Sequence, residues 1–431
     1  MSKAKKEYRN KFLDDTKYPT CLAPWHAITI KWGGAVVPDI IYKQKLGNIN
    51  DQTLKEIWYG KKAKELRKMH RSRDVPEYCI GCQKKEQSGR SRRMFFWDKM
   101  DYDLRIESEW HDWDMEPDIR YLDFTLSNKC NLACIHCGPF VSTGWSKLGK
   151  KLNKEMPEYW TEQQIGYNGV DDFTFMDNLF ANPEYFRNLE TVALRGGEPL
   201  YDEHCYNVLK WFVDNDIASK VSLDISTNAT VVEQKFLDIF AEFKHVELLI
   251  SIEATDELYS VIRGGKNFTW EDLNKNVDQF YALDNVEVVF AVTVMNTNVF
   301  NLDKIWEWFA KYHRKKASIA MTNVVVSPDY LNIAHLPDEL KQIAIEKIKD
   351  IPTSTIWPLN SVHSDVFEYQ TGIADIRKGL QREVEEKEQK RWWQRYLQYT
   401  ADLDRLNGTD TFSLVEELSP YRELIDGKET A

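Results

Sequence analysis

The chain has 431 residues, which is enough for one large barrel with an appendage or for two to three smaller units. Hydrophobic residues make up 42% and charged residues 29%, so the composition excludes a disordered or fibrous protein. The formal net charge of −11 argues against a general nucleic-acid binder and against a protein that adheres to anionic membranes. Two basic stretches, 61–73 and 84–93, are predicted to be solvated surface, with contact to an anionic partner as the alternative.

The amino end lacks the apolar core of a signal peptide, and no run of 18 apolar residues occurs. These features predict a soluble, cytoplasmic protein. Six of the seven cysteines fall into two groups, and in a reducing compartment such close spacing indicates metal binding rather than disulfides. Cys205 stands alone in a helix-like apolar segment, so we expect an inert core residue.

Three regions follow one another along the chain. Residues 1–110 form a small module that contains Cys21, Cys79 and Cys82. Residues 111–335 alternate β-branched or aromatic runs with amphipathic segments, which is typical of repeated βα units around a parallel sheet. We expect an α/β fold, a partial TIM-type (β/α)6 barrel, with six strands at Tyr121 to Leu126, Thr191 to Gly196, Val221 to Thr227, Val246 to Ile252, Val286 to Val294 and Ala317 to Val326.

Two segments depart from this alternation. The connection after Cys137 is longer than one crossover helix requires, so an insertion is expected there, either a lid that faces the substrate or a surface excursion. Residues 336–431 are predicted to be almost wholly helical. Residues 378–406 are expected to form one long helix that packs on the barrel or on another subunit.

Cys130, Cys134 and Cys137 form a CX3CX2C motif directly after the first barrel strand. Three thiolates can hold three irons of a cubane cluster and leave the fourth iron open for a ligand. The loop would lie at the C-terminal mouth of the barrel, where such folds place their active sites. A structural zinc knuckle completed by His136 or by a distant residue is the alternative.

The motif resembles the cysteine loop of the radical S-adenosylmethionine (radical SAM) superfamily, with His136 at a position that is usually aromatic. After the second strand, Gly196, Gly197 and Glu198 resemble the family's GGEP motif, which implies binding of the methionine amino group. A turn followed by an acidic residue that starts a helix is the simpler interpretation of the same residues.

Further resemblances follow at the ends of later strands, and together they cover residues 119–330. Ser226 and Asn228 are similar to the family's ribose-binding element, and Ser251 with Glu253 resembles its SIDG motif. Arg263 would pair with the cofactor carboxylate, with a surface salt bridge as the alternative. The resemblance also implies an apolar adenine wall at Val325 and substrate contacts at Asn296 and Asn298.

The N-terminal module resembles the twitch or SPASM auxiliary iron-sulfur module, in which a cysteine commonly stands where this chain has Asp39. Aspartate can give an oxygen to iron, so the implied ligands of a second 4Fe-4S cluster are Cys21, Asp39, Cys79 and Cys82. A zinc site made of the three cysteines and His26 is the alternative.

The resemblance implies an enzyme that cleaves S-adenosylmethionine reductively to a 5′-deoxyadenosyl radical and abstracts hydrogen from a substrate. A peptide or protein side chain is the favoured substrate, and a small metabolite is the alternative. It also implies two 4Fe-4S clusters and an electron donor such as flavodoxin or ferredoxin. Two alternatives are a non-catalytic metal-binding scaffold and a radical enzyme whose N-terminal metal module is purely structural.

Overall fold

The structure is a computed structural model that describes residues 21–72, 74, 76–82, 92–100, 113–155, 175–264, 268–313, 317–356 and 368–422. It divides into two compact units. The first contains residues 1–127, 169–225 and 238–246, and the second contains residues 128–168, 226–237 and 247–431. The predicted domain limits stay predictions.

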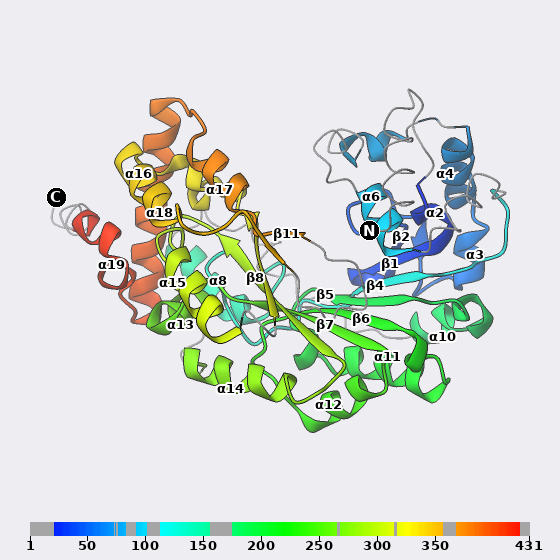
Figure 1. Cartoon of the computed structure of the whole chain (residues 1–431). Helices are drawn as coiled ribbons and strands as arrows, with labels where there is room; N and C mark the ends of the chain where they lie inside the picture. Colours follow the sequence, from blue (N-terminus) through cyan, green and yellow to red (C-terminus); the bar gives the residue numbers. More distant parts are fainter. Residues whose placement is uncertain are drawn as a thin grey trace. The chain divides into compact units, whose positions relative to one another are not determined.

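The strands form a nine-stranded, mostly parallel sheet in the order β3-β2-β1-β4-β5-β6-β7-β8-β9 (Figure 1). The six predicted barrel strands are confirmed, with ends that shift by up to two residues, and so is the partial barrel. They are β4 Tyr121–Thr125, β5 Thr191–Arg195, β6 Ser222–Thr227, β7 His245–Ser251, β8 Val286–Val294 and β9 Ala317–Val324.

The N-terminal segment adds three strands to this sheet, β1 Ala27–Lys31, β2 Ala35–Val37 and β3 Gly47–Asn48. A strand in this segment was expected, but not its place beside the barrel. β1 pairs with β4 in parallel, with Ala27 opposite Tyr121 and Thr29 opposite Asp123. β2 and β3 follow as antiparallel neighbours. The N-terminal segment therefore extends the barrel sheet.

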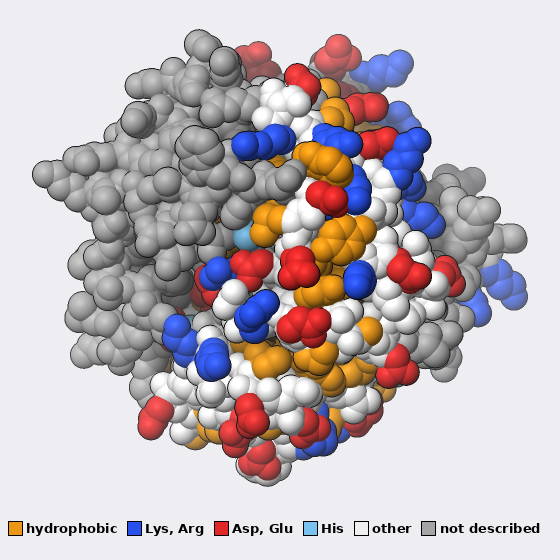
Figure 2. Space-filling view, turned by 90° about the vertical axis from the view of Figure 1, so that its right-hand side faces the viewer, with side chains coloured by type: hydrophobic (Ala, Val, Ile, Leu, Met, Phe, Trp, Pro, Cys, Tyr) orange, Lys and Arg blue, Asp and Glu red, His pale blue; other side chains and the backbone are white. Residues whose placement is uncertain are grey.

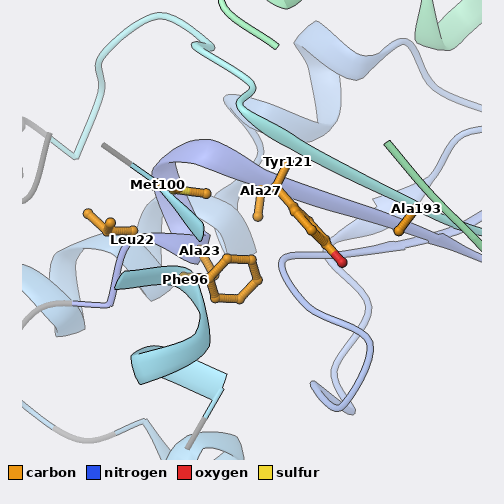
Figure 3. Close-up of a cluster of buried hydrophobic side chains, with 7 residues drawn as sticks. All are labelled: Leu22, Ala23, Ala27, Phe96, Met100, Tyr121 and Ala193. Atoms are coloured by element: carbon orange, nitrogen blue, oxygen red, sulfur yellow. The ribbon is translucent and has the colours of Figure 1, made fainter. Parts of the chain in front are cut away.

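The first unit packs α2, β1 and α6 onto the barrel strands. Its helices are α2 Ala23–His26, α3 Leu54–Trp58, α4 Lys61–Arg71, α6 Arg92–Lys99, α10 Phe175–Leu179 and α11 Glu203–Asp214. Figure 3 shows their contact as one apolar cluster formed by Leu22, Ala23, Ala27, Phe96, Met100, Tyr121 and Ala193. Phe96 and Tyr121 meet edge to face with ring centroids 5.4 Å apart, a favoured aromatic arrangement. Cys205 is buried in α11, as predicted.

Two basic side chains, Arg67 and Arg93, are buried and so depart from the prediction of solvated surface. Arg67 of α4 is buried and donates hydrogen bonds to the backbone oxygens of Trp58 and Trp113. Its guanidinium also stacks over the Trp58 ring at 4.4 Å. Arg67 therefore holds local backbone in place, whereas Lys61 and Lys62 are exposed.

The second unit surrounds its strands with helices that bury one apolar face each. Its helices are α8 Gly144–Glu155, α13 Asp256–Arg263, α14 Trp270–Phe280, α15 Leu302–Trp308, α16 Asp338–Lys347, α17 Ile373–Leu380, α18 Glu386–Asn407 and α19 Thr411–Leu414, and α12 Gln234–Ala241 spans the boundary between the units. In α14 a capping box between Thr269 and Asp272 starts the helix, and Leu273, Val277 and Phe280 form its buried face.

Short helical turns complete the chain. They are Trp32–Gly34, Glu77–Cys79, Pro183–Phe186, Pro199–Tyr201, Ala218–Lys220, Phe309–His313, Asp329–Leu331, Ile333–His335 and Glu416–Tyr421.

The predicted helical tail is confirmed, with one correction. The expected long helix over 378–406 is broken at residues 381–385, so α17 ends at Leu380 and α18 begins at Glu386. Two short strands also occur there, and β10 Ser354–Ile356 pairs antiparallel with β11 Glu368–Gln370. The tail does pack on its own chain, since the Tyr396 hydroxyl lies 3.1 Å from Thr297 Oγ1.

The visible face in Figure 2 mixes Lys and Arg with Asp and Glu side chains, with apolar side chains between them. Among the described residues, no helix combines the length and the apolar character that crossing a membrane requires.

Candidate functional site

Cys130, Cys134 and Cys137 lie in the loop that follows β4, all within the second unit. Cys134 is buried, while Cys130 and Cys137 are partly exposed. The loop turns so tightly that the Cys137 N–H donates to the Cys134 oxygen at 2.9 Å. A hydrogen bond from the Cys134 thiol and the charge of Arg263 both lower the pKa of Cys137. A lowered pKa favours the thiolate, which is the form that binds metal.

The backbone of this loop is held by four side-chain donors. Thr143 Oγ1 donates to the Cys130 oxygen at 3.0 Å, Ser142 Oγ to Leu132, Trp145 Nε1 to Cys134 at 2.9 Å and the Tyr399 hydroxyl to Ile135 at 2.9 Å. The first part of the predicted insertion therefore braces the cysteine loop, whereas residues 156–174 lie outside the described residues. Sequence reasoning missed these donors, and Tyr399 lies 264 positions from its partner.

Asn228, predicted to contact the ribose, lies beside the first cysteine. Its Nδ2 is 3.8 Å from Cys130 Sγ and 3.0 Å from Asn131 Oδ1, while its Oδ1 accepts hydrogen bonds from Thr230. Ser226 belongs to β6, two residues earlier. Two of the predicted cofactor residues are thus on the strand end that approaches Cys130.

A buried ion pair lies next to the other two cysteines. Arg263 Nη1 donates to Glu253 Oε2 at 3.0 Å, and the two side chains are 6% and 1% exposed. His136 Nε2 is 3.9 Å from the other oxygen of Glu253, and burial lowers the pKa of His136. In this structure the charge of Arg263 is paired with Glu253, so its predicted role on the cofactor carboxylate stays a prediction.

Three polar atoms of this group lack a hydrogen-bond partner among the described residues: His136 Nδ1, Glu253 Oε1 and Arg263 Nε. Buried polar groups without partners are rare in proteins and are often satisfied by a bound group. An iron-sulfur cluster bound by thiolates is anionic, and this loop suits it. The loop holds three thiols on a fixed backbone, and the cation of Arg263 acts on two of them, Cys134 and Cys137. The residues present therefore fit the expected cluster and cofactor.

Two residues predicted as substrate contacts have amide donors that bond within the chain, and their contact with substrate stays a prediction. Asn298 is fully buried, and its Nδ2 donates to the backbone oxygens of Glu253 and Thr293 at 2.8 and 2.9 Å. Asn296 is also fully buried and donates to the Tyr330 oxygen. Both amides hold the backbone of the second unit, because their donors are used by chain carbonyls.

The remaining predicted cofactor residues of the second unit lie at strand ends. Ser251 ends β7, and Val325 follows β9 with its N–H bonded to the Val294 oxygen at 2.9 Å. Val325 is buried, as an apolar wall requires, whereas the neighbouring Val326 is 69% exposed.

The GGEP motif belongs to the first unit and forms the turn after β5. Gly196 and Gly197 have φ angles of 80° and 49°, a region that favours glycine. A Cβ on Gly196 would lie 2.5 Å from Thr125 Cγ2, so the turn also needs a close backbone approach. Glu198 is buried and accepts a hydrogen bond from Leu200 N at 3.1 Å. The GGEP residues therefore form a turn, and this does not conflict with their predicted binding of the methionine amino group.

The four predicted ligands of the second cluster, Cys21, Asp39, Cys79 and Cys82, line one cavity of about 40 Å³ in the first unit. Burial raises the pKa of Cys79 to about 12, and that of Cys21 still further. Such thiols favour the protonated form unless a metal takes the place of the proton. The cavity therefore brings together the donor set that an auxiliary cluster would need.

Arg92 and His70, which sequence reasoning missed, line the same cavity. Arg92 Nε and Nη2 lie 2.9 and 2.7 Å from Asp39 Oδ1, so one oxygen of the predicted ligand is already paired. His70 Nε2 lies 3.8 Å from Cys79 Sγ. The zinc alternative named His26, whose Nδ1 lies 2.9 Å from the Asp118 backbone oxygen and which is not among the residues that line the cavity.

Within the residues that the structure describes, no three His, Cys, Asp or Glu side chains converge around a position for a single metal ion. The predicted cluster ligands and both zinc alternatives therefore stay predictions.

A row of charged side chains inside the first unit also escaped sequence reasoning. Arg195 Nη2 donates to Asp224 Oδ2 at 2.8 Å, and its Nε lies 3.7 Å from Asp123 Oδ2. Burial raises the pKa of Asp123 to about 6; Arg195 opposes this shift and Asp224 adds to it. The signal was present in the sequence as aspartates within two apolar strands.

Two family models match the chain. Residues 21–83 match SPASM, described as an iron-sulfur cluster-binding domain, and residues 124–309 match the radical SAM superfamily. An uncharacterized protein of Methanocaldococcus jannaschii is 27% identical over 198 residues, which are 45% of this chain and 58% of the relative. The match thus spans less than two thirds of that relative's length.

Solved structures are more distant. The structure of native anSMEcpe with bound AdoMet has 17% identity and a TM-score of 0.35, over 48% of this chain and 52% of that chain. Streptococcus suis SuiB bound to precursor peptide SuiA has 14% identity and a TM-score of 0.32, over 67% and 63%.

Proposed function

We propose, on the premise that this chain is a radical SAM protein with a SPASM-type iron-sulfur module, that it abstracts hydrogen from a peptide or protein side chain. The radical SAM domain implies a 4Fe-4S cluster and S-adenosylmethionine, and the SPASM domain implies auxiliary iron-sulfur binding. SPASM modules accompany many peptide-modifying enzymes, and this supports a peptide substrate.

One observation carries the proposal: the CX3CX2C loop has its three thiols on a backbone fixed by four side-chain donors, with a buried Arg263 alongside. Cys130, Cys134 and Cys137 would hold the cluster. When bound, the cluster and S-adenosylmethionine supply an electron and a 5′-deoxyadenosyl radical.

The chain's own residues have defined tasks in this proposal. Arg263 offsets negative charge at Cys134 and Cys137, and Glu253 keeps the guanidinium in place. Asn228 reaches the loop beside Cys130, where it would orient the ribose. Gly196, Gly197 and Glu198 would receive the methionine amino group, and Ser226, Ser251, His136 and Val325 would line the rest of the cofactor site. A small electron-transfer protein such as flavodoxin or ferredoxin would supply the reductant.

Two triple variants test the proposal as a matched pair. Cys130, Cys134 and Cys137 changed together to Ala should abolish 5′-deoxyadenosine formation after dithionite reduction and remove about four irons per chain. Cys21, Cys79 and Cys82 changed together to Ala should also remove about four irons but leave 5′-deoxyadenosine formation in place. The measurements are iron and sulfide analysis of anaerobically reconstituted protein and chromatography of the nucleoside.

The alternative functions give different results in the same experiment. A colourless wild-type protein with stoichiometric zinc and no cofactor cleavage would indicate a metal-binding scaffold. Iron in the first site with zinc in the second would indicate a radical enzyme with a structural N-terminal module.

The role of Asp39 needs its own test. If Asp39 is the fourth ligand, Asp39→Ala should lower the iron held by the N-terminal module, and Asp39→Cys should restore it, because a thiolate can take the same position. Asp51→Ala, which changes an exposed carboxylate of the same module, is the control. Full iron retention in Asp39→Ala would mean that Asp39 serves only as the ion-pair partner of Arg92.

A further inference from the structure

The interior charged row of the first unit lies in one layer of the sheet. Thr29 of β1 is opposite Asp123 of β4, which is opposite Ala193 of β5, and Ala193 is opposite Asp224 of β6. Thr125 and Arg195 are opposite each other two residues further along. Because alternate residues of a strand share a face, these side chains all project from the same side of the sheet.

Asp123 has no hydrogen-bond donor among the described residues, although it is 0% exposed. The nearest cation, Arg195, donates to Asp224, and its Nε lies 3.7 Å from Asp123 Oδ2, which is an ion pair but too long for a hydrogen bond. Arg92 pairs with Asp39, and Lys31 donates to the Tyr42 backbone oxygen at 3.0 Å. A buried carboxylate without a donor is destabilising, so such a group persists mainly where a ligand satisfies it.

Other buried side-chain oxygens near Asp123 also lack a hydrogen-bond partner among the described residues. Asp224 Oδ1 and the Oγ1 atoms of Thr29 and Thr125 also lack partners among the described residues, and all three side chains are at least nine-tenths buried. Thr29 is on a different strand from both carboxylates, so its unpartnered hydroxyl is an independent observation that points to a ligand. Three carboxylate oxygens without a donor, two on Asp123 and one on Asp224, therefore lie in one layer on the same face of the sheet.

A primary ammonium group has three N–H donors, no acceptor and a positive charge, which matches three vacant carboxylate oxygens. A hydroxyl would satisfy only one of them, and a carboxylate or phosphate would be repelled. We propose that Asp123 and Asp224 bind the primary ammonium group of the substrate, as on a lysine side chain or an amino terminus. This assignment rests on the proposed function and names the substrate class of the same barrel.

The test uses a small probe on the anaerobically reconstituted full chain. n-Butylammonium chloride should raise the melting temperature in a saturable way, because a ligand that binds only the folded state stabilises it, and 1-butanol should not. In Asp123→Asn and in Asp224→Asn the apparent affinity for n-butylammonium should fall at least tenfold. Asp214→Asn, at an exposed ion pair on α11, should bind as the wild type does.

Each contrary outcome has a defined meaning. An equal response to the amine and the alcohol, or an undiminished response in both Asn variants, would show that water fills the site and would overturn the proposal. A tenfold loss of S-adenosylmethionine affinity in Asp123→Asn would assign the ammonium to the cofactor and overturn the substrate assignment. The probe needs no turnover, so an absence of 5′-deoxyadenosine in the wild type would contradict the proposed function without affecting this result.

Discussion

Gly264→Ala is expected to strip iron from the CX3CX2C site while leaving the N-terminal module loaded. Gly264 ends α13 at φ +65°, and a Cβ there would lie 2.2 Å from the Ala133 oxygen and 2.6 Å from its carbonyl carbon. Ala133 lies between Cys130 and Cys134, so the obstacle is the backbone of the cysteine loop, which cannot rotate away as a side chain can. The adjacent Ile262 oxygen also accepts a hydrogen bond from Ile135 N at 2.9 Å.

The predicted cost has two parts. A left-handed conformation costs a non-glycine residue about 1 kcal/mol, and the contact with Ala133 adds a shift of the loop. Gly408→Ala is the matched control, because Gly408 ends α18 at φ 61° and carries the same conformational penalty. The control should lose about 1 kcal/mol of stability and keep its iron. Equal iron in both variants would show that the loop tolerates the displacement.

The sequence predicted the elements whose signal is local. β4 to β9 appear as apolar or β-branched runs bounded by polar segments, and the cysteine spacing identifies the cluster loop without any tertiary information. The family matches over residues 21–83 and 124–309 confirm the resemblance. A local sequence pattern does not show which distant residues a side chain contacts. It could not reveal that the hydroxyl of the tail residue Tyr399 donates to the Ile135 backbone oxygen.

The parts that were missed depend on strand register and on side-chain direction. Asp123 and Asp224 are single polar residues within buried strands, and only the pairing of β4, β5 and β6 shows that they share a layer. Asn298 was read as a substrate contact because it follows a strand, but its side chain turns back to the Glu253 oxygen. A strand-end position thus predicts nearness to a site without predicting contact with a ligand.

A pH-dependent change of stability should identify Asp123 as a buried carboxyl. Its pKa is raised to about 6 from 3.8 by burial, with Arg195 opposing the shift and Asp224 adding to it, so the folded state binds the proton more tightly than the unfolded state does. Stability from this group is therefore present below pH 4 and is lost as the pH rises to 6. Asp123→Asn should stabilise the metal-free protein by about 1 to 3 kcal/mol at pH 7.5 and by much less at pH 4.5, measured by urea unfolding. An equal effect at both pH values would contradict a titrating Asp123.

The ion pair of Glu253 and Arg263 should show the largest effect on stability. Breaking a buried pair leaves one charge without a partner, so Arg263→Met should cost the metal-free protein about 3 to 5 kcal/mol. Replacing both residues, Glu253→Gln with Arg263→Met, should recover most of that loss, because no isolated charge then remains buried. Urea unfolding of the two single variants and the double variant gives the coupling energy of the pair.

The exposed pair of Lys210 and Asp214 is the control, since its side chains are 51% and 52% exposed and solvent screening should make its coupling energy much smaller than that of the buried pair. If the stability losses of the two single variants simply add in the double variant, the charges of Glu253 and Arg263 are stabilised separately.

If the two charges are coupled, the double variant also tests whether the pair acts in cofactor chemistry as well as in folding. It should be stable yet reconstitute its iron poorly, because Cys137 loses the cation that lowers its pKa. A stable double variant with full iron and full cofactor cleavage would limit this pair to a role in folding.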